Sequence, residues 1–220
     1  MTQTTRVPAA AHMDEMYRYQ RYIYDATRAY YLLGRDDLIR GLAAKPNMKV
    51  LEIACGTARN LLRAADLYPG AEFYGIDISS EMLTTARASV DKSSHKARIR
   101  LAHADATEFN TQALFGFEAA DRVFISYAVS MIPPWEAAID EALRHVTPGG
   151  ALHIVDFGMM EGMPAPARRT VVAWLAKFDV TPRQSLRTVC EAAAKRHGAS
   201  CTFYTSPRGY WSKAVLERTT

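Results

Sequence analysis

The chain has 220 residues, of which 49% are hydrophobic and 23% are charged, a balance that allows a full core and argues against global disorder. Its length suits a single α/β domain, and it contains no apolar run long enough to span a membrane. The net charge of +4 favours anionic partners without choosing between nucleic acid and a membrane surface. Three cysteines without metal-ligand spacing suit a reducing cytoplasm and predict no metal site.

The N-terminal region predicts a tail followed by a helical lid. Residues 1–11 are polar, lack the apolar segment of a secretory signal and are expected to be disordered, and residues 12–47 are expected to form the lid. Six of the eleven tyrosines lie between residues 17 and 31, and Tyr17, Tyr24 and Tyr31 share a helix face because they are seven apart. These rings either pack the helix onto the domain or cover a cationic ligand through cation–π contacts.

The lid is expected to continue into a second helix. Gly34 is typical of a helix end, and Asp36 is predicted to cap a helix over residues 37–44. The domain proper is predicted to occupy residues 48–220 and to begin with a strand over residues 49–54.

A β-α-β unit opens this domain. The first strand runs into a turn of small residues, a helix begins near Thr57, and a second strand over residues 72–76 is closed by Asp77. This arrangement binds the ribose of a nucleotide-like cofactor, because the turn lets a ligand approach the backbone and the acid accepts the ribose hydroxyls. Only Gly56 remains of the three glycines of a dinucleotide fingerprint, so the pattern alone is a weak dinucleotide signal.

The rest of the chain continues the strand–helix alternation. Ser79 is predicted to cap the next helix, and a Pro-Gly-Gly turn at 148–150 is predicted to enter the fifth strand. A terminal hairpin is expected around residues 207–209. The remaining strands are expected at 99–103, 121–126, 151–156, 201–205 and 210–216, and the helices at 135–146, 168–178 and 182–197.

The segment Glu52-Ile-Ala-Cys-Gly56-Thr-Ala58, followed by Gly75-Ile-Asp77-Ile-Ser, resembles motif I and the following acid of class I S-adenosylmethionine-dependent methyltransferases. The resemblance implies an α/β, Rossmann-like sheet of seven mostly parallel strands with a C-terminal antiparallel hairpin, and S-adenosylmethionine as cofactor. Ala54 departs from the family's glycine and adds a methyl group where the cofactor's amino-acid end should pass. The cofactor-binding residues that the resemblance implies are Glu52, Ala54, Gly56, Asp77, Ile78, Met82, Asp105, Ala106 and Ser126.

Two of these residues have ordinary alternatives. Met82 either faces the adenine or belongs to the core. Asp105 either accepts the adenine amino group or caps a turn. The position of Asp105 after the third strand favours the cofactor, because ligands bind at the carboxyl ends of parallel strands.

The tyrosine- and arginine-rich segment from Tyr17 to Asp36, together with Ser126-Tyr127-Ala-x-Ser130-Met131-Ile132-Pro133, resembles the N-methyltransferases of bacterial betaine-lipid synthesis. This resemblance implies up to three methylations of the amino group of diacylglyceryl-homoserine. It also implies a cytoplasmic protein, peripheral on the inner face of an anionic membrane. Residues expected to orient the amine are Tyr24, Tyr31 and Tyr127, and residues expected to bind the substrate are Tyr17, Arg28 and Arg35.

Other functions fit parts of the sequence. A soluble small-molecule or quinone methyltransferase would use the same fold, and Ala54 also suits a cofactor-binding module without turnover. An aminopropyl or aminocarboxypropyl transferase would need paired acids after the fourth strand, which are missing. No Asn-Pro-Pro-Tyr sequence is present, so a nucleic-acid substrate is not expected. His103 and His153 are candidate bases, although strand histidines are more often packed residues.

Overall fold

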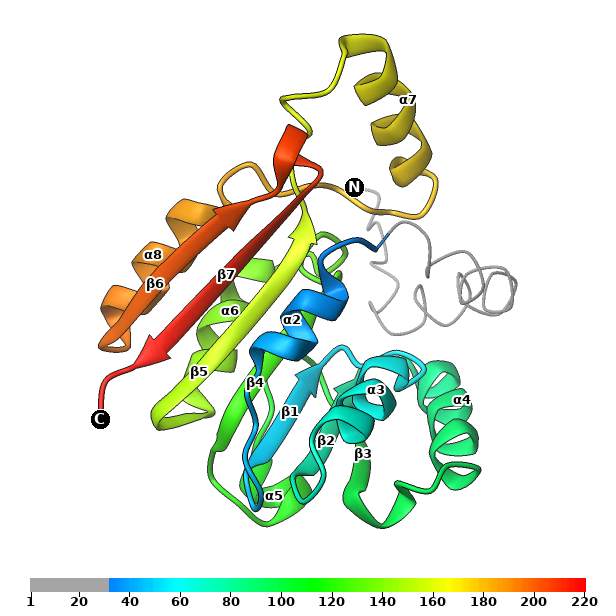
Figure 1. Ribbon diagram of the computed structural model, residues 1–220, viewed down its shortest axis with the longest axis vertical. Helices are drawn as coiled ribbons and strands as arrows, with labels where there is room; N and C mark the ends of the chain where they lie inside the picture. The colour runs from blue at the N-terminus through cyan, green and yellow to red at the C-terminus, as the bar shows by residue number, and fades with distance from the viewer. Residues whose placement is uncertain (1–31) are drawn as a thin grey trace, which may run out of the picture.

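The computed structural model describes residues 32–220 and is built around a seven-stranded sheet with the strand order β3-β2-β1-β4-β5-β7-β6 (Figure 1). β1 to β5 are parallel, whereas β7 runs antiparallel to both β5 and β6. The predicted sheet with its C-terminal hairpin is therefore confirmed. The strands are β1 Lys49–Ile53, β2 Glu72–Asp77, β3 Ile99–His103, β4 Ala120–Ser126, β5 Val146–Phe157, β6 Ala199–Thr205 and β7 Trp211–Arg218.

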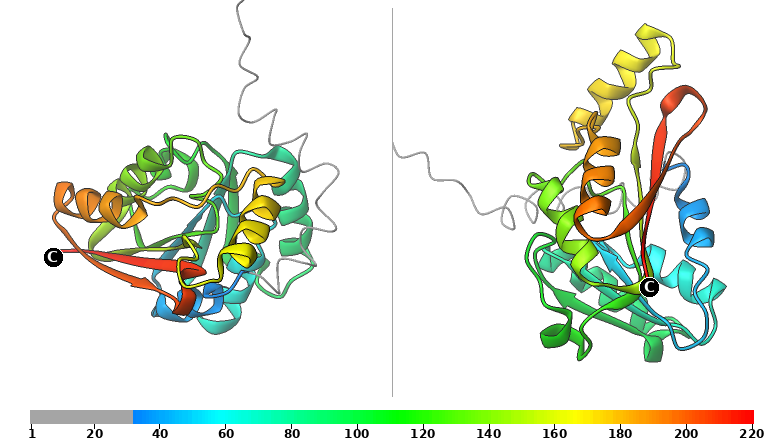
Figure 2. Two further views of the ribbon diagram at one scale, coloured as in Figure 1. Left: turned by 90° about the horizontal axis from the view of Figure 1, so that it is seen from above. Right: turned by 90° about the vertical axis from the view of Figure 1, so that its left-hand side faces the viewer.

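Helices cover both faces of the sheet (Figures 1 and 2). α2, α3 and α4 pack on one face, and α6 and α8 pack on the other. α7 lies beyond the carboxyl ends of the parallel strands, where Figure 1 shows it above the end of β5. The helices are α2 Arg35–Gly41, α3 Arg59–Leu67, α4 Ser80–Asp91, α5 Thr111–Phe115, α6 Trp135–Arg144, α7 Ala165–Ala176 and α8 Leu186–Arg196, with short 3₁₀ turns at Lys96–Arg98 and Pro207–Gly209.

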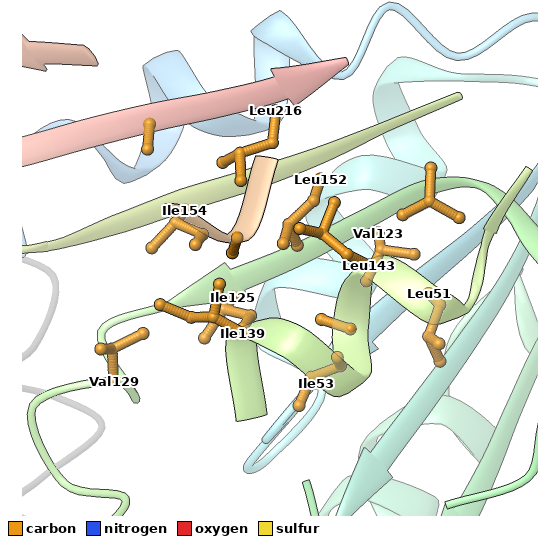
Figure 3. Close-up of a cluster of buried hydrophobic side chains, with 14 of the residues drawn as sticks. Leu51, Ile53, Val123, Ile125, Val129, Ile139, Leu143, Leu152, Ile154 and Leu216 are labelled. Carbon is orange, nitrogen blue, oxygen red and sulfur yellow. The ribbon is translucent and has the colours of Figure 1, made fainter. Parts of the chain in front are cut away.

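The alternation of apolar residues along β1 and β4 places a core on each face. Leu51 and Ile53 of β1 point toward α6 together with Val123 and Ile125 of β4 (Figure 3). Neighbouring residues such as Phe124 point to the opposite cluster. Because side chains of a strand alternate between faces, two buried faces require the nearly continuous apolar runs that this sequence shows.

α2 differs from its prediction in both its bounds and its cap. It begins at Arg35, and its N-terminal cap is Gly34 with φ of 82°. A Cβ atom at Gly34 would lie 2.7 Å from the Trp211 ring, so packing against β7 excludes a larger residue there. Asp36 is therefore inside the helix and does not cap it. The helix predicted before Gly34 lies outside the described residues.

The lid predicted over residues 12–47 is described only from residue 32 onward. In that part, Leu38, Ile39 and Leu42 are fully buried in the core that α3 and α4 share. The described end of the predicted lid therefore packs on a face of the sheet.

Several predicted boundaries were wrong because packing extends or shortens the local pattern. β5 takes in the predicted turn at 148–150, and its pairing with β4 changes register between Ala120 and Arg122. α6 ends at Arg144, before the predicted 146. α7 begins at Ala165, with a proline at its first turn where a missing N–H costs little. α8 begins only at Leu186, and β7 continues to Arg218.

Across residues 32–220, none of the helices combines the length and the apolar character needed to cross a membrane. In the same range, no three of the His, Cys, Asp and Glu side chains come together as metal ligands.

Candidate functional site

The turn after β1 is built from left-handed backbone conformations. Ala54, Gly56 and Ala58 have φ of 55°, 54° and 63°. An alanine in this region costs on the order of 1 kcal/mol or more, and such strain is concentrated at functional turns. Among residues 32–220, no atom lies within 4 Å of the place that a Cβ atom at Gly56 would take, so the described residues leave the space beside this backbone open. The turn therefore offers a ligand close access to the main chain.

Asp77 joins this turn to the one that follows β2. Its Oδ2 accepts a hydrogen bond from the Gly56 amide at 2.8 Å, and its Oδ1 accepts one from the Ser79 amide at 2.9 Å. Asp77 as a whole is only 7% exposed. A carboxylate has about four acceptor positions, so a group at this place can also accept hydrogen bonds from the hydroxyls of a ribose. The predicted cap is confirmed, since Ser79 Oγ accepts from the Met82 amide at 3.2 Å.

Glu52 lies behind this turn as a buried acid with one side-chain partner. Its Oε1 accepts a hydrogen bond from Asn60 Nδ2 at 2.7 Å, and its Oε2 has no partner within residues 32–220. Burial raises the pKa of Glu52 well above its usual range, and the neighbouring Asp77 charge raises it further. This unpaired buried oxygen lies beside the turn after β1, residues 54–58, which is termed the cofactor turn. It marks a polar position that a ligand group can satisfy. Asn60 was missed, although its place four residues after Gly56 on α3 is a usable signal.

We expect Glu52→Gln to change how stability depends on pH. An acid with a raised folded-state pKa adds stability at low pH, and this contribution is lost as the pH rises above the ordinary value of 4.5. Glu52→Gln removes this pH-dependent loss of stability. The melting temperature of the variant minus that of the wild type should therefore increase as the pH rises from about 4.5 to about 8. The constant cost of burying an amide does not alter this slope. Thermal melts across the range test it, with the exposed Glu136→Gln expected to follow the wild type; parallel curves for Glu52→Gln would contradict it.

Tyr127 follows Ser126 at the carboxyl end of β4 and has φ of 55°, which is unusual for a bulky residue. Its ring is 3% exposed and packs edge-on against Phe157 with 4.7 Å between centroids. Its hydroxyl donates to the Leu33 carbonyl oxygen, and burial raises its pKa. The hydroxyl thus has a backbone partner, and its predicted role in orienting an amine stays a prediction.

Ser126 is placed at the same sheet edge. Its Oγ is buried without a hydrogen-bond partner in the described part of the chain. It is therefore available to a ligand at the end of β4.

The residues predicted to surround the adenine lie after β2 and β3. Met82 is buried at 4% exposure, in keeping with the core alternative, and Ile78 and Ala106 are half-buried. Asp105 is exposed, and its Oδ1 accepts from the Thr107 amide at 2.8 Å and from the Thr107 hydroxyl at 2.7 Å. Asp105 thus makes the hydrogen bonds of a turn cap, which was the alternative role considered for it. Its contact with adenine stays a prediction.

Arg35 lies at the rim of the same region. Its side chain is 11% exposed, and burial together with the nearby Arg59 charge lowers its pKa. It borders a cavity of about 560 Å³ that also reaches the cofactor turn through Thr57 and Asn60. The lining residues are Arg35, Asp36, Thr57, Arg59, Asn60, Leu62, Arg63, Asp66 and Ser89. Four further candidates, Tyr17, Tyr24, Arg28 and Tyr31, lie outside the described residues.

The two histidines are held as parts of the fold. The Nε2 of exposed His103 lies 2.8 Å from the Ile78 carbonyl oxygen. His153 is buried in the middle of β5, where burial lowers its pKa to about 4.

Asp156, which closes β5, was missed. It is fully buried, and burial raises its pKa to about 6. The hydrogen bonds that Asp156 accepts from two backbone amides act in the opposite direction and lower its pKa. An acid at a strand end was the signal that found Asp77, and it would also have found Asp156.

The site fits the ribose and amino-acid parts of S-adenosylmethionine. Asp77 would supply the ribose acceptor, and within residues 32–220 the space beside Gly56 is open and Glu52 Oε2 has no hydrogen-bond partner. When bound, this cofactor supplies a methyl group activated by its sulfonium.

Comparisons with known proteins agree with this assignment. The family described as "Methyltransferase domain" matches residues 50–150. The chain is 29% identical over 121 residues to a demethylmenaquinone methyltransferase of Geobacillus sp. (strain WCH70), covering 54% of this chain and 50% of the relative. It is 28% identical over 128 residues to a ubiquinone/menaquinone biosynthesis C-methyltransferase of Cereibacter sphaeroides (strain ATCC 17029 / ATH 2.4.9), covering 58% and 50%. The chain thus spans about half the length of the curated relatives it matches.

Solved structures share the fold at low sequence identity. Phosphoethanolamine N-methyltransferase 2 of Haemonchus contortus, in complex with S-adenosylmethionine, aligns with a TM-score of 0.76 at 16% identity, covering 98% of this chain and 61% of that one. The [4+2]-cyclase SpnF aligns with a TM-score of 0.73 at 15% identity, covering 97% and 98%.

The sheet, the turn after β1 and these matches together support a class I S-adenosylmethionine-dependent methyltransferase. The residues of the site fit S-adenosylmethionine, the molecule bound in the Haemonchus contortus structure. The Geobacillus and Cereibacter relatives are named for quinones and not for a betaine lipid, so the acceptor is a separate question.

Proposed function

We propose that the protein transfers methyl groups from S-adenosylmethionine to the amino group of diacylglyceryl-homoserine, in up to three rounds, at an anionic membrane surface. The observation that carries the proposal is Arg35, whose guanidinium is largely buried at the rim of the cofactor turn. The resemblance of residues 17–36 to betaine-lipid N-methyltransferases supports the same acceptor.

The position of Arg35 suits a substrate that carries a carboxylate beside its amine. Tyr127 holds the Leu33 carbonyl, so the segment that leads into α2 is fixed against the end of β4. Arg35 follows two residues later and faces the cavity shared with Thr57 and Asn60. A guanidinium binds a carboxylate with two parallel hydrogen bonds, which fixes orientation as well as position. The amine of such a substrate would then lie close to the cofactor turn.

The chemistry asks mainly for alignment. The nitrogen lone pair forms the new N–C bond while the C–S bond breaks, the sulfur keeps that electron pair, and a proton leaves the nitrogen before each later round. Holding amine and methyl in line is a proximity effect. The amine must be neutral, and a free α-amino group titrates at about 7.7–8.0. A strong base is therefore dispensable, which agrees with the burial of His153 and with the contact of His103 Nε2 to the Ile78 carbonyl oxygen.

A second candidate is C-methylation of a quinol, and it rests on a different observation. The Geobacillus and Cereibacter relatives carry names of quinone methyltransferases. The two candidates differ in the acceptor atom, since one requires an amine and the other a ring carbon.

In the first experiment, the purified protein is incubated with S-adenosylmethionine and one of three acceptor samples. These are vesicles that contain diacylglyceryl-homoserine, vesicles that contain a demethylated quinol, and a solution of water-soluble amines. Mass spectrometry should show one to three added methyl groups on the lipid only. Product in the quinol pool alone would reject the proposal in favour of the second candidate, and product in the soluble pool alone would reject both lipid acceptors.

The same assay tests the role of Arg35. We expect Arg35→Gln to raise KM for the lipid about 10-fold to 100-fold, the loss of a charge-assisted pair of about 1.5–3 kcal/mol. Cofactor affinity measured by calorimetry should stay unchanged. The matched control is Arg40→Gln on the same helix, where an exposed arginine pairs with Asp37 at 2.6 Å. A loss of cofactor affinity with an unchanged lipid KM would instead place the cofactor's own carboxylate at Arg35.

A further inference from the structure

The segment that follows β4, residues 127–132, is termed the acceptor loop because it leaves the sheet beside the cofactor turn. Arg183, in the connection between α7 and α8, holds this loop by its carbonyl groups. Its Nε donates to the Val129 oxygen at 3.1 Å, and its Nη2 donates to the oxygens of Ser130 at 3.3 Å and Ile132 at 3.0 Å. Its guanidinium carbon also lies 5.7 Å from the centre of the Trp135 ring. One side chain thus spans the last four residues of the loop.

Asp156 holds the same loop from the sheet. Its Oδ2 accepts from the Ser130 amide at 2.9 Å, and its Oδ1 accepts from the Phe157 amide at 2.7 Å. The Thr181 amide adds a hydrogen bond to the Ser130 oxygen at 3.1 Å. Ser130 is 1% exposed. Its amide is therefore bound by β5, and its carbonyl is bound by the α7–α8 connection.

The loop needs such support because it starts from a strained residue. Tyr127 has a left-handed backbone, which costs on the order of 1–3 kcal/mol for a bulky residue and persists only where the surroundings determine it. The Tyr127 amide donates to the Val155 oxygen at 2.8 Å, and its hydroxyl holds Leu33. These contacts fix the start of the loop, whereas Arg183 and Asp156 fix its later part.

We infer that Arg183 is a positioning residue for methyl transfer: it acts through the acceptor loop and keeps the Tyr127 end of the site in place. The inference rests on the proposed function, because the loop is taken to border the methyl acceptor. Only a planar guanidinium reaches three carbonyl groups in one geometry, since an ammonium on a flexible stem is a single point of donation. The arrangement also links the α7–α8 connection to the site.

The test compares Arg183→Lys and Arg183→Gln with Arg187→Gln. Arg187 lies nearby on α8, over the Phe203 ring at 4.5 Å and paired with Glu191 at 3.9 Å, and it is a matched arginine without a contact to the loop. Both Arg183 variants should lower kcat on the order of 10-fold to 100-fold, because small misplacements at a reacting centre have effects of this size. Cofactor affinity should stay within about two-fold, as the turn after β1 is untouched.

A second readout does not depend on turnover. Backbone hydrogen exchange of a peptide over residues 127–134 should become faster in Arg183→Lys, while a peptide over residues 52–62 keeps its wild-type rate. Unchanged exchange in the first peptide, or an unchanged kcat, would overturn the inference. Should the wild type methylate no acceptor, the proposed function fails, and the exchange measurement still decides whether Arg183 holds the loop.

Discussion

Replacing Asp77 by alanine is expected to weaken S-adenosylmethionine binding by at least about 100-fold, because it would remove the two charge-assisted hydrogen bonds that we expect Asp77 to make to the ribose, at about 1.5–3 kcal/mol each. Asp77 also aligns the site, since it accepts from the amides of Gly56 and Ser79 and so fixes the turns after β1 and β2 together. The variant therefore removes both the ribose acceptor and the link that shapes the site. Titration calorimetry with the cofactor measures the change.

The matched control is Asp121→Ala at the opposite end of the sheet. Asp121 also accepts from a backbone amide, that of Lys49 at 2.7 Å, so its loss costs a similar structural contact far from the cofactor turn. It should lower stability without changing cofactor affinity. Asp77→Asn, which keeps the side chain's shape, covers the case in which Asp77→Ala does not fold. Wild-type affinity in both Asp77 variants would disprove the site.

The parts of the site that are local in sequence could be predicted from it. The strand, the small-residue turn and the acid at the end of β2 lie within about thirty residues, and neighbouring parallel strands bring their carboxyl ends to one edge. Gly56, Asp77 and Ser79 accordingly lie where the pattern placed them. The hairpin was predictable for the same reason, because its turn and both strands are contiguous.

The residues that were missed depend on partners far along the chain. Arg183 meets carbonyl groups more than fifty positions away, and no periodicity indicates such a contact. The Gly34 cap is set by Trp211 on β7, which lies nearly the whole domain away in sequence. The backbone partner of Tyr127 was likewise not predicted: its hydroxyl donates to the Leu33 carbonyl oxygen, because a buried hydroxyl takes a carbonyl oxygen that packing offers. The role of Tyr127 in orienting an amine stays a prediction.

Gly75 belongs to the cofactor motif, but packing and not a ligand explains why a glycine is needed there. We expect Gly75→Ala to destabilise the protein by about 1–3 kcal/mol. A Cβ atom there would lie 2.7 Å from Leu61 Cδ1 on α3, 2.9 Å from Cys55 Sγ and 2.9 Å from Leu101 Cδ2. Cys55 belongs to the turn after β1, so relief of these contacts would displace the cofactor turn. The cofactor affinity of Gly75→Ala should therefore fall together with its stability.

Gly41→Ala provides the matched control, because a Cβ atom at this last residue of α2 would meet no atom of residues 32–220 within 4 Å. The same substitution should there stabilise the protein by up to about 1 kcal/mol through helix propensity and leave cofactor binding unchanged. Urea unfolding and calorimetry on both variants separate the effects. If Gly75→Ala were as stable as the wild type but lost the cofactor, the glycine would serve the ligand directly. If Gly75→Ala kept both the stability and the cofactor affinity of the wild type, β2 and α3 would have room to separate. The close packing of the cofactor turn on α3 would then not be needed for binding.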